Sequence, residues 1–298
     1  MSFATLDLDQ APSVVKETLK AFVSRKSATA DGDVGLEGWL RGIAFNERQV
    51  SGYADLCGFT PSDRVPLTYP QVLALPLHLA IGNDPRFPYR LPGMVHVGNT
   101  FEQSADLTIG DVVDLRAWTQ GSRQTKLGTE ADLHTECHRD GLVVWRSTAS
   151  IVFKRAPKQR GASKASAEPE ATPWETIGDP WQVPADQGRR YAGVSGDYNP
   201  IHLYGWSAKL FGFKRPVVHG MWTLARAVAA LTGRAGATPL RTLDVQFRSP
   251  LYLPSSAQFA IRPAAASAVE FRLLDERSGK PILLGSANSA QAHPATSR

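Results

Sequence analysis

The feature that most constrains the fold of this chain is a weak internal repeat. The stretch "VSGYADLCGF" (50–59) resembles "GRRYAGVSGD" (188–197), with the tyrosine, the alanine and one glycine in register. A segment with the pattern of a buried helix follows each copy, at 68–82 and at 219–233. The repeat predicts that the 298 residues fold as two units built on one plan.

Each helix is followed by a block of alternating apolar and polar residues. The strands predicted from this alternation lie at 94–104, 111–120, 124–138 and 142–154 in the first half, and at 241–249, 256–263, 268–276 and 281–290 in the second. Asp140-Gly141 marks a tight hairpin turn. We therefore expect each half to hold a short strand, a buried helix and four antiparallel strands.

An antiparallel sheet curved around one long helix is the hotdog fold. The sequence predicts the α+β class, with two tandem hotdog folds whose sheets lie side by side as a pseudo-dimer in one chain. A further helix is expected at about 12–25, ahead of the first half. We place the first hotdog half at 1–153, a linker at 154–172 and the second half at 173–298.

The linker contains the most basic stretch of the chain, "KRAPKQRGASK" at 154–164. A basic run can bind nucleic acid, but no aromatic residues are interleaved with this one. Its Ala, Ser, Pro, Gly, Glu and Lys content, without any apolar period, favours a solvated connection. A nucleic-acid partner is not expected.

Composition sets the broad class of protein. A hydrophobic content of 42% with 20% charged residues is ordinary for a globular chain. No apolar run approaches the roughly 18 residues of a membrane span, and the first ten residues do not have the pattern of a secretory signal. Two cysteines, Cys57 and Cys137, are too few for a disulfide framework and fit a reducing compartment. We expect a cytoplasmic protein with no membrane partner.

The stretch "SGDYNPIH" (195–202) carries the strongest chemical signal. It places Asp197 five residues before His202, with Asn199-Pro200 between them. Such residues often form a turn and nothing more. An acid and an imidazole held on a stiff loop can also act as a general acid/base pair.

The residues after this stretch favour the catalytic interpretation. With Ala208, Phe211-Gly212 and "RPVVHGM" (215–221), the motif resembles the MaoC-like family of (R)-specific enoyl-CoA hydratases and 3-hydroxyacyl thioester dehydratases. The resemblance covers 172–290, with a degenerate copy in the first half. It implies reversible hydration of trans-2-enoyl-CoA to (R)-3-hydroxyacyl-CoA, without a metal or redox cofactor, since coenzyme A is part of the substrate.

The resemblance also implies a role for each motif residue. Asp197 would be the base for the attacking water, and His202 would hold that water and supply the proton. Asn199 would orient the water or brace the loop, which Pro200 stiffens. Gly220 falls at a helix start, where a backbone N–H without an intrahelical partner can bind the thioester oxygen.

The other candidate residues surround this core of the site. Candidate substrate-binding residues next to the catalytic ones are Tyr198, Pro200, Val218 and His219. His219 could belong to the site or only to the N-terminal cap of the helix. Three basic residues near the expected mouth, Lys214, Arg215 and Arg248, could meet the phosphates of coenzyme A. Surface solubility explains them equally well.

The first half provides an internal comparison. Aligning the helix starts places Pro70 at the position of Gly220, and proline has no N–H to donate. Phe59 falls at the position of Asp197. We expect the first half to be catalytically inactive, to hold the acyl chain with its apolar helix, and to leave one active site per chain.

Two other histidine-containing features have less specific interpretations. On a strand, His134, Glu136 and His138 would share one face and could bind zinc, but a solvated polar face explains them as well. Cys57 and His96 are interpreted as packing residues. No metal site is expected.

Alternatives to the hydratase remain at this point. A hotdog thioesterase would use a carboxylate to activate water against the carbonyl carbon. A non-catalytic protein that binds acyl thioesters is a third class. The thioester carrier could be coenzyme A or an acyl carrier protein, and the chain could form a homodimer.

Overall fold

The computed structural model describes residues 3–8, 10–23, 35–153, 172–234, 238–264 and 267–289. In the first half the elements are β1 (Ala4–Leu8), α1 (Val14–Val23), β2 (Leu36–Ala44), α2 (Glu47–Cys57), α3 (Tyr69–Leu73), α4 (Leu75–Asn83), β3 (Val95–Gln103), β4 (Val112–Thr119), β5 (Arg123–Thr125), β6 (Gly128–Arg139) and β7 (Leu142–Phe153). In the second half they are β8 (Glu175–Thr176), β9 (Trp181–Val183), α5 (Gln187–Ser195), the 3₁₀ turn η1 (Pro200–His202), α6 (Gly205–Leu210), α7 (Gly220–Thr232), β10 (Thr242–Phe247), β11 (Ser255–Pro263), β12 (Ala268–Asp275) and β13 (Pro281–Asn288).

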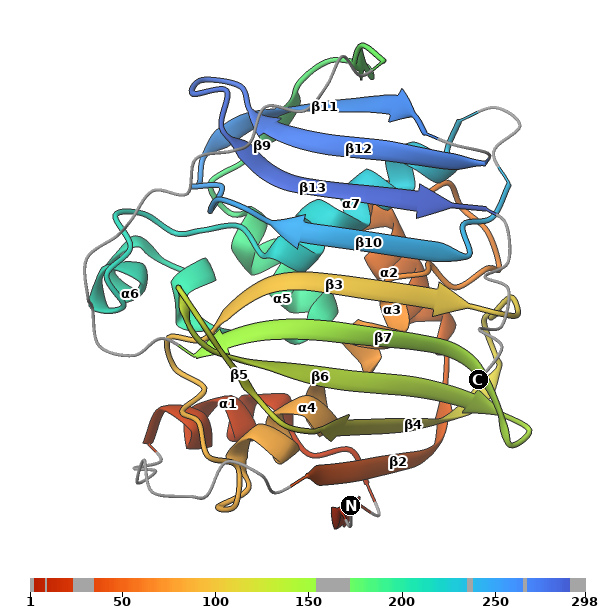
Figure 1. Cartoon of the computed structure of the whole chain (residues 1–298), viewed down its shortest axis with the longest axis vertical. Helices are drawn as coiled ribbons and strands as arrows, with labels where there is room; N and C mark the ends of the chain where they lie inside the picture. The colour runs from red at the N-terminus through yellow and green to blue at the C-terminus, as the bar shows by residue number, and fades with distance from the viewer. Residues whose placement is uncertain are drawn as a thin grey trace.

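Within these residues thirteen strands form one continuous sheet. Its order is β1-β2-β4-β6-β7-β3-β10-β13-β12-β11-β8, with β5 beside β6 and β9 beside β11. The pairs are antiparallel except β1 with β2. Figure 1 shows the strands stacked as one curved layer with helices α2, α3, α5 and α7 behind it. The α+β arrangement of two tandem hotdog folds in one chain is confirmed.

The two halves meet where β3 pairs with β10. The register there runs from Thr242 opposite Glu102 to Gln246 opposite Gly98. Ladder hydrogen bonds thus continue from one half into the other, and no sheet edge is exposed at the junction. A further contact joins the repeated helices α2 and α5, in which the rings of Tyr53 and Tyr191 lie 6.1 Å apart.

Helix α7 confirms the helix predicted at 219–233. Its buried residues lie on more than one face and include Leu224, Ala225 and Val228, all at 1% exposure or less. A helix that is apolar on most sides must be surrounded by other structure. The curved sheet of the second half and helix α2 provide those surroundings.

The helix predicted at 68–82 is interrupted in the structure. Helix α3 ends at Leu73 and α4 begins at Leu75, with Ala74 as the shared cap. Pro76 explains the break, because proline has no N–H for the carbonyl of Val72 and its ring crowds that turn.

The repeated stretches 50–59 and 188–197 also differ from the prediction. No helix is predicted at either stretch, but both are helices, α2 and α5. The buried positions Val50, Tyr53 and Cys57 have helical spacing, which a search for strands overlooks. Each helix ends at a left-handed glycine, Gly58 with φ of 78° and Gly196 with φ of 74°.

The predicted strands largely agree with the structure. The exception is 124–138, which a turn at residues 126–127 divides into β5 and β6. Asp140 and Gly141 both have positive φ, as the hairpin prediction requires. The predicted helix at 12–25 is present as α1, whose described part ends at Val23.

Residues 154–171 of the predicted linker lie outside the described residues, so the proposed domain boundaries stay a prediction. Among the residues that are described, no helix is both long enough and apolar enough to cross a membrane.

Candidate active site

The motif that carries Asp197 starts where helix α5 ends. Gly196 adopts the left-handed conformation that closes the helix, and its N–H donates to the carbonyl of Ala192. The Asp197 N–H then donates to the hydroxyl of Ser195 at 3.2 Å. This C-terminal cap turns the chain sharply and leaves the Asp197 side chain 40% exposed.

The turn after Asp197 is braced by its own side chains. Asp197 Oδ1 accepts from the N–H of Asn199 at 3.1 Å, and Asn199 Oδ1 accepts from the N–H of Ile201 at 3.4 Å. Asn199 thereby caps η1, which begins at Pro200. The Ser207 hydroxyl of α6 donates to the carbonyl of Pro200 at 2.7 Å. Of the two roles expected of Asn199, the structure shows the bracing of the loop.

His202 has a defined tautomer. Its Nδ1 lies 2.6 Å from the carbonyl oxygen of Val217, and a carbonyl can only accept, so Nδ1 carries the proton. Nε2 therefore has a free lone pair. Burial lowers the pKa of His202, while the charge of Asp197 and the Val217 carbonyl oppose that effect. The imidazole is thus a neutral hydrogen-bond acceptor.

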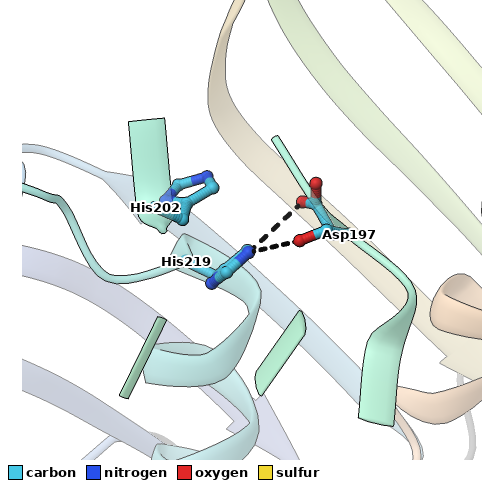
Figure 2. Close-up of side chains that lie close together, drawn as sticks. All are labelled: Asp197, His202 and His219. Atoms are coloured by element: carbon cyan, nitrogen blue, oxygen red, sulfur yellow. Dashed lines mark hydrogen bonds and ion pairs between the residues drawn. The ribbon is translucent and has the colours of Figure 1, made fainter. Parts of the chain in front are cut away.

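His219 links the two predicted catalytic residues. Its Nε2 lies 2.9 Å from the backbone oxygen of Asp197 and 3.8 Å from Oδ2, and its ring is stacked on His202 with centroids 3.7 Å apart. Burial, helped by the neighbouring His202, lowers the pKa of His219 to about 3. His219 is therefore neutral, and its contact with Asp197 is a hydrogen bond from Nε2–H (Figure 2).

His219 lies both in the Asp197/His202 cluster and at the start of the helix, the two places that the sequence allowed. It occupies the N-cap position of α7, but its side chain makes no capping hydrogen bond. It is 2% exposed and its Nε2–H holds the Asp197 backbone in place, while its contact with substrate stays a prediction. The sequence offered only its neighbour Gly220 as a signal for this role.

The three side chains converge on one small space. One carboxylate oxygen of Asp197 and one ring nitrogen each of His202 and His219 lie within 4.8 Å of one another. Figure 2 shows a ring nitrogen of His202 turned toward the carboxylate. A water that hydrogen-bonds two groups at about 2.8 Å spans up to roughly 5.6 Å, so one water can bridge Asp197 and His202.

This cluster is also the one group of metal-capable side chains in the described part of the chain. The nitrogen of His219 that is nearest the carboxylate carries a proton, which it donates to the Asp197 backbone. A protonated nitrogen has no lone pair for a cation. The donor set therefore suits a water better than a metal ion.

Gly220 begins helix α7, as its predicted role requires. As the first helical residue it has an N–H without an intrahelical acceptor. A Cβ at this position would lie 3.1 Å from the ring of Phe247, so a side chain would crowd the helix start. The N–H and the positive end of the helix dipole are available to an oxyanion.

The remaining candidates fall into three groups. Val218 is 3% exposed within the hydrophobic core, and its contact with substrate stays a prediction. Tyr198 is exposed and Pro200 is half-buried beside Asp197, as a substrate contact requires. The basic residues Lys214, Arg215 and Arg248 are exposed and form no ion pair within the described residues.

Arg215 has the clearest connection to the site among the three basic residues. Its guanidinium lies over the ring of Tyr252 at 5.8 Å, and Tyr252 forms an isolated β-bridge with Val217. The carbonyl of Val217 is the one that orients His202. Contacts of Lys214 and Arg248 with substrate stay predictions.

The residues on β6 that were considered as zinc ligands, His134, Glu136 and His138, form hydrogen bonds with neighbouring protein side chains. His134 Nδ1 lies 3.0 Å from the Thr148 hydroxyl, and His138 Nε2 lies 3.1 Å from a carboxylate oxygen of Glu136. His134 is also stacked on Trp118. These contacts support the solvated polar face that the sequence allowed.

Comparisons with known proteins place the chain among characterised relatives. A family model described as "MaoC like domain" matches residues 162–271. The chain is 30% identical over 217 residues to "3-hydroxyacyl-thioester dehydratase X" of Mycobacterium tuberculosis, covering 72% of this chain and 76% of that protein. The crystal structure of HtdX from the same organism superposes with a TM-score of 0.71 at 26% identity, covering 84% of this chain and 98% of that one. A MaoC-like dehydratase from Phytophthora capsici shares the fold, with a TM-score of 0.69 at 18% identity over 92% of this chain and 100% of that chain.

Proposed function

The chain belongs to the MaoC-like dehydratase family, and we propose that it interconverts trans-2-enoyl thioesters and (R)-3-hydroxyacyl thioesters at Asp197 and His202. The class of reaction follows from the relatives, whose names describe dehydratases and enoyl-CoA hydratases. The chain is accordingly a hydro-lyase acting on acyl thioesters. The residues and the order of proton movements are the proposal.

The observation that carries the proposal is that two hydrogen-bond acceptors, one on Asp197 and one on His202, are separated by a distance that one water molecule can bridge. Asp197 offers a carboxylate and His202 offers the lone pair of Nε2, and a carboxylate oxygen of Asp197 lies within 4.8 Å of a ring nitrogen of His202. A water between them donates one hydrogen to each and directs an oxygen lone pair at the β-carbon. That arrangement places a nucleophile and its base together before the substrate reacts.

The tautomer of His202 revises the roles expected from the sequence. A neutral His202 whose Nδ1–H is bound to Val217 cannot supply a proton until it has received one. In hydration, Nε2 takes a proton from water as the oxygen bonds to the β-carbon, and the alkene electrons move to the thioester enolate. The imidazolium, stabilised by the Asp197 charge, then returns the proton to the α-carbon. Dehydration follows the reverse path.

Gly220 supplies the group that stabilises the thioester oxygen. The enolate oxygen of the thioester gains charge as water adds, and a backbone N–H at a helix start stabilises it in a site of low dielectric. The proposed mechanism thus assigns the nucleophile, the proton and the oxyanion to separate groups.

The test is loss of the enoyl-thioester absorbance with crotonyl-CoA and a longer enoyl-CoA. Asp197→Asn is the main variant, because the amide oxygen can still accept from Asn199 and keep the turn. A loss of at least about 10²-fold is expected. Asp55→Asn, an exposed carboxyl on α2, is the matched control and should keep the wild-type rate. Release of free coenzyme A without loss of the enoyl band would instead support the thioesterase.

The carrier and the cofactor requirement are proposed in the same terms. We propose coenzyme A as carrier, with Arg215 near its phosphates, and an acyl carrier protein as the alternative. Comparing coenzyme A and carrier-protein thioesters of one acyl group separates the two. We propose that no metal takes part, so the rate should survive dialysis against a chelator. A homodimer would be detected by sedimentation, and the proposed site does not depend on it.

A further inference from the structure

The interior of the first half contains polar side chains where the second half is apolar. We propose that these side chains recognise an uncharged polar group, a hydroxyl or a keto oxygen, on the acyl chain of the substrate. The inference rests on the proposed function, because it concerns the acyl group of the same thioester. It differs from the sequence prediction of a purely apolar acyl site.

Asn99 on strand β3 is the central observation. It is 2% exposed, and neither its amide nitrogen nor its amide oxygen has a hydrogen-bond partner within the described structure. It shares a sheet face with the core residue Phe101, and its neighbours across the strands are Ala149 and Val245. Leaving both groups of a buried amide unpaired costs a few kcal/mol. A polar ligand atom would remove that cost.

Two hydrogen-bonded pairs of polar groups lie near Asn99 in the interior of the first half. On the same sheet face, Ser147 of β7 lies opposite Thr135 of β6. The Ser147 hydroxyl donates to the side-chain oxygen of Gln71 on α3, and the Thr135 hydroxyl lies 2.9 Å from Nε2 of His78 on α4. Helices α3 and α4 therefore each direct a polar side chain toward the sheet at this level.

The second half shows what the equivalent positions hold when no polar ligand is needed. Thr100 and Asp244 face each other in the middle of the β3–β10 pair, so the residues before them, Asn99 and Leu243, are equivalent. The same equivalence relates the corner at 105–111 to that at 249–255. An amide in one half thus replaces a leucine in the other.

The equivalence extends to the neighbouring strands. Thr100 pairs with Thr148, and Asp244 pairs with Ser286, so Ser147 corresponds to Gly285. Thr135 lies opposite Ser147, and Phe271 lies opposite Gly285. The Phe271 ring covers Gly285 so closely that a Cβ there would lie 2.4 Å from it. The second half fills this layer with an aromatic ring, and the first half fills it with hydroxyls.

His96 connects the polar set to the catalytic centre. The ring of Phe247 lies against Gly220, and the ring of His96 lies 4.9 Å from Phe247. Nε2 of His96 is buried without a hydrogen-bond partner in the described structure. The charge of Asp197 also acts on His96, which places the ring within electrostatic reach of the reacting atoms. In the proposed path, the acyl chain passes from the thioester site along His96.

The polar set carries no charge at neutral pH. Burial lowers the pKa of His78 to about 3 and that of His96 to about 4. The other members are amides and hydroxyls: Gln71, Asn99, Thr135 and Ser147. Neutral donors and acceptors pair with neutral partners, whereas a buried carboxylate would need a positive charge. The ligand group is therefore a hydroxyl or a keto oxygen.

The experiment compares acyl-CoA esters that differ by one hydroxyl. Saturated acyl-CoA esters of equal chain length, with the hydroxyl moved one carbon at a time beyond the β-carbon, are titrated by calorimetry. We expect one position to bind about tenfold more tightly than the unsubstituted chain, the value of one well-made hydrogen bond. Asn99→Leu, which installs the residue of the second half, should abolish that preference and improve binding of the unsubstituted chain.

Controls separate this inference from folding and from the proposed function. Thr100→Val changes the adjacent residue on the outer face of the same strand and should keep the preference. Equal binding of hydroxylated and plain chains at every position would overturn the inference. So would an equal loss for all ligands in Asn99→Leu, since that result indicates a structural role. Crotonyl-CoA hydration, measured in parallel, shows whether the proposed function holds when the preference does not.

Discussion

Replacing Gly188 with alanine is expected to displace His202 without removing any of its atoms. Gly188 lies in the first turn of α5, and a Cβ there would lie 1.9 Å from the backbone oxygen of His202. An ordinary contact begins at 3.4 Å, so α5 and η1 must separate by about 1.5 Å. A misplacement of about 1 Å in a catalytic group can cost 10²-fold in rate. We therefore expect Gly188→Ala to lower kcat/KM by at least about 10²-fold.

The assay is hydration of crotonyl-CoA, with thermal unfolding of the same samples. Gly193→Ala is the matched control, because Gly193 lies in the same helix and a Cβ there meets nothing within 4 Å. That variant should keep wild-type kcat/KM and gain about 0.5–1 kcal/mol of stability from helix propensity. If Gly188→Ala also kept the wild-type rate, the position of His202 would not be set by α5, and its assignment as the proton carrier would be refuted.

Three further predictions use the same site and its buried histidines. Gly220→Pro should lower kcat by about 10²–10³-fold, because proline lacks the N–H that stabilises the oxyanion. Gly220→Ala adds a Cβ as proline does but keeps the N–H, so its kcat should fall much less. Equal losses of kcat in the two variants would contradict the oxyanion role. Because the pKa of His202 is lowered, the acidic fall in kcat/KM should lie below pH 6.5, and a fall centred at or above 6.5 would argue against His202 as the acceptor. His78, His96 and His219 have depressed pKa values in the folded protein, so their neutral forms support folding above pH 6.5 and that support is lost as the pH falls. At pH 5 each of these histidines should lower the free energy of unfolding by about 2 kcal/mol, and urea titrations at pH 7 and pH 5 measure the difference.

The fold could be predicted from sequence where local rules and tertiary demands agree. Period-two alternation placed the long strands, and Asp140-Gly141 fixed a hairpin, because both signals depend on neighbouring residues only. The helix at 68–82 was predicted as one continuous helix because its apolar pattern extends across Pro76. The break between α3 and α4 arises from the backbone geometry of that proline, which an apolar pattern does not record. Helices α2 and α5 were not predicted, because each is short, has buried residues on one side only, and adjoins residues typical of turns.

The site was predictable to the extent that its residues are close in sequence. Asp197, Asn199 and His202 lie within one turn, so a single stretch revealed them. The tautomer of His202 depends on the carbonyl of Val217, fifteen residues later, and the role of His219 depends on a backbone oxygen 22 residues before it. Such contacts exist only after the chain has folded, and no spacing rule encodes them.

The same pseudo-symmetry explains why one half would keep the chemistry. His219 and Thr68 occupy the N-cap positions of α7 and α3, and each packs against a repeated tyrosine: the ring of Tyr191 lies 4.9 Å from His219, and the hydroxyl of Tyr53 lies 2.9 Å from that of Thr68. At the turn after the helix, Phe59 follows Gly58 as Asp197 follows Gly196.

The first half therefore retains the scaffold that positions a site and replaces the reacting groups one by one. A carboxylate becomes an aromatic ring at Phe59. With the N-caps aligned, Tyr69 takes the place of Gly220, so the expected alignment of Pro70 with Gly220 is wrong by one residue; the N–H of Tyr69 donates to the carbonyl of Pro66 at 2.8 Å and is not free for an oxyanion. Once no oxyanion forms in this half, its interior is free to vary without loss of rate. Polar groups such as Asn99, which would hinder a plain acyl chain, can then be retained for the part of the substrate that does not react. The proposed catalysis in one half and the proposed selection of the acyl group in the other are thus compatible with a single duplicated fold.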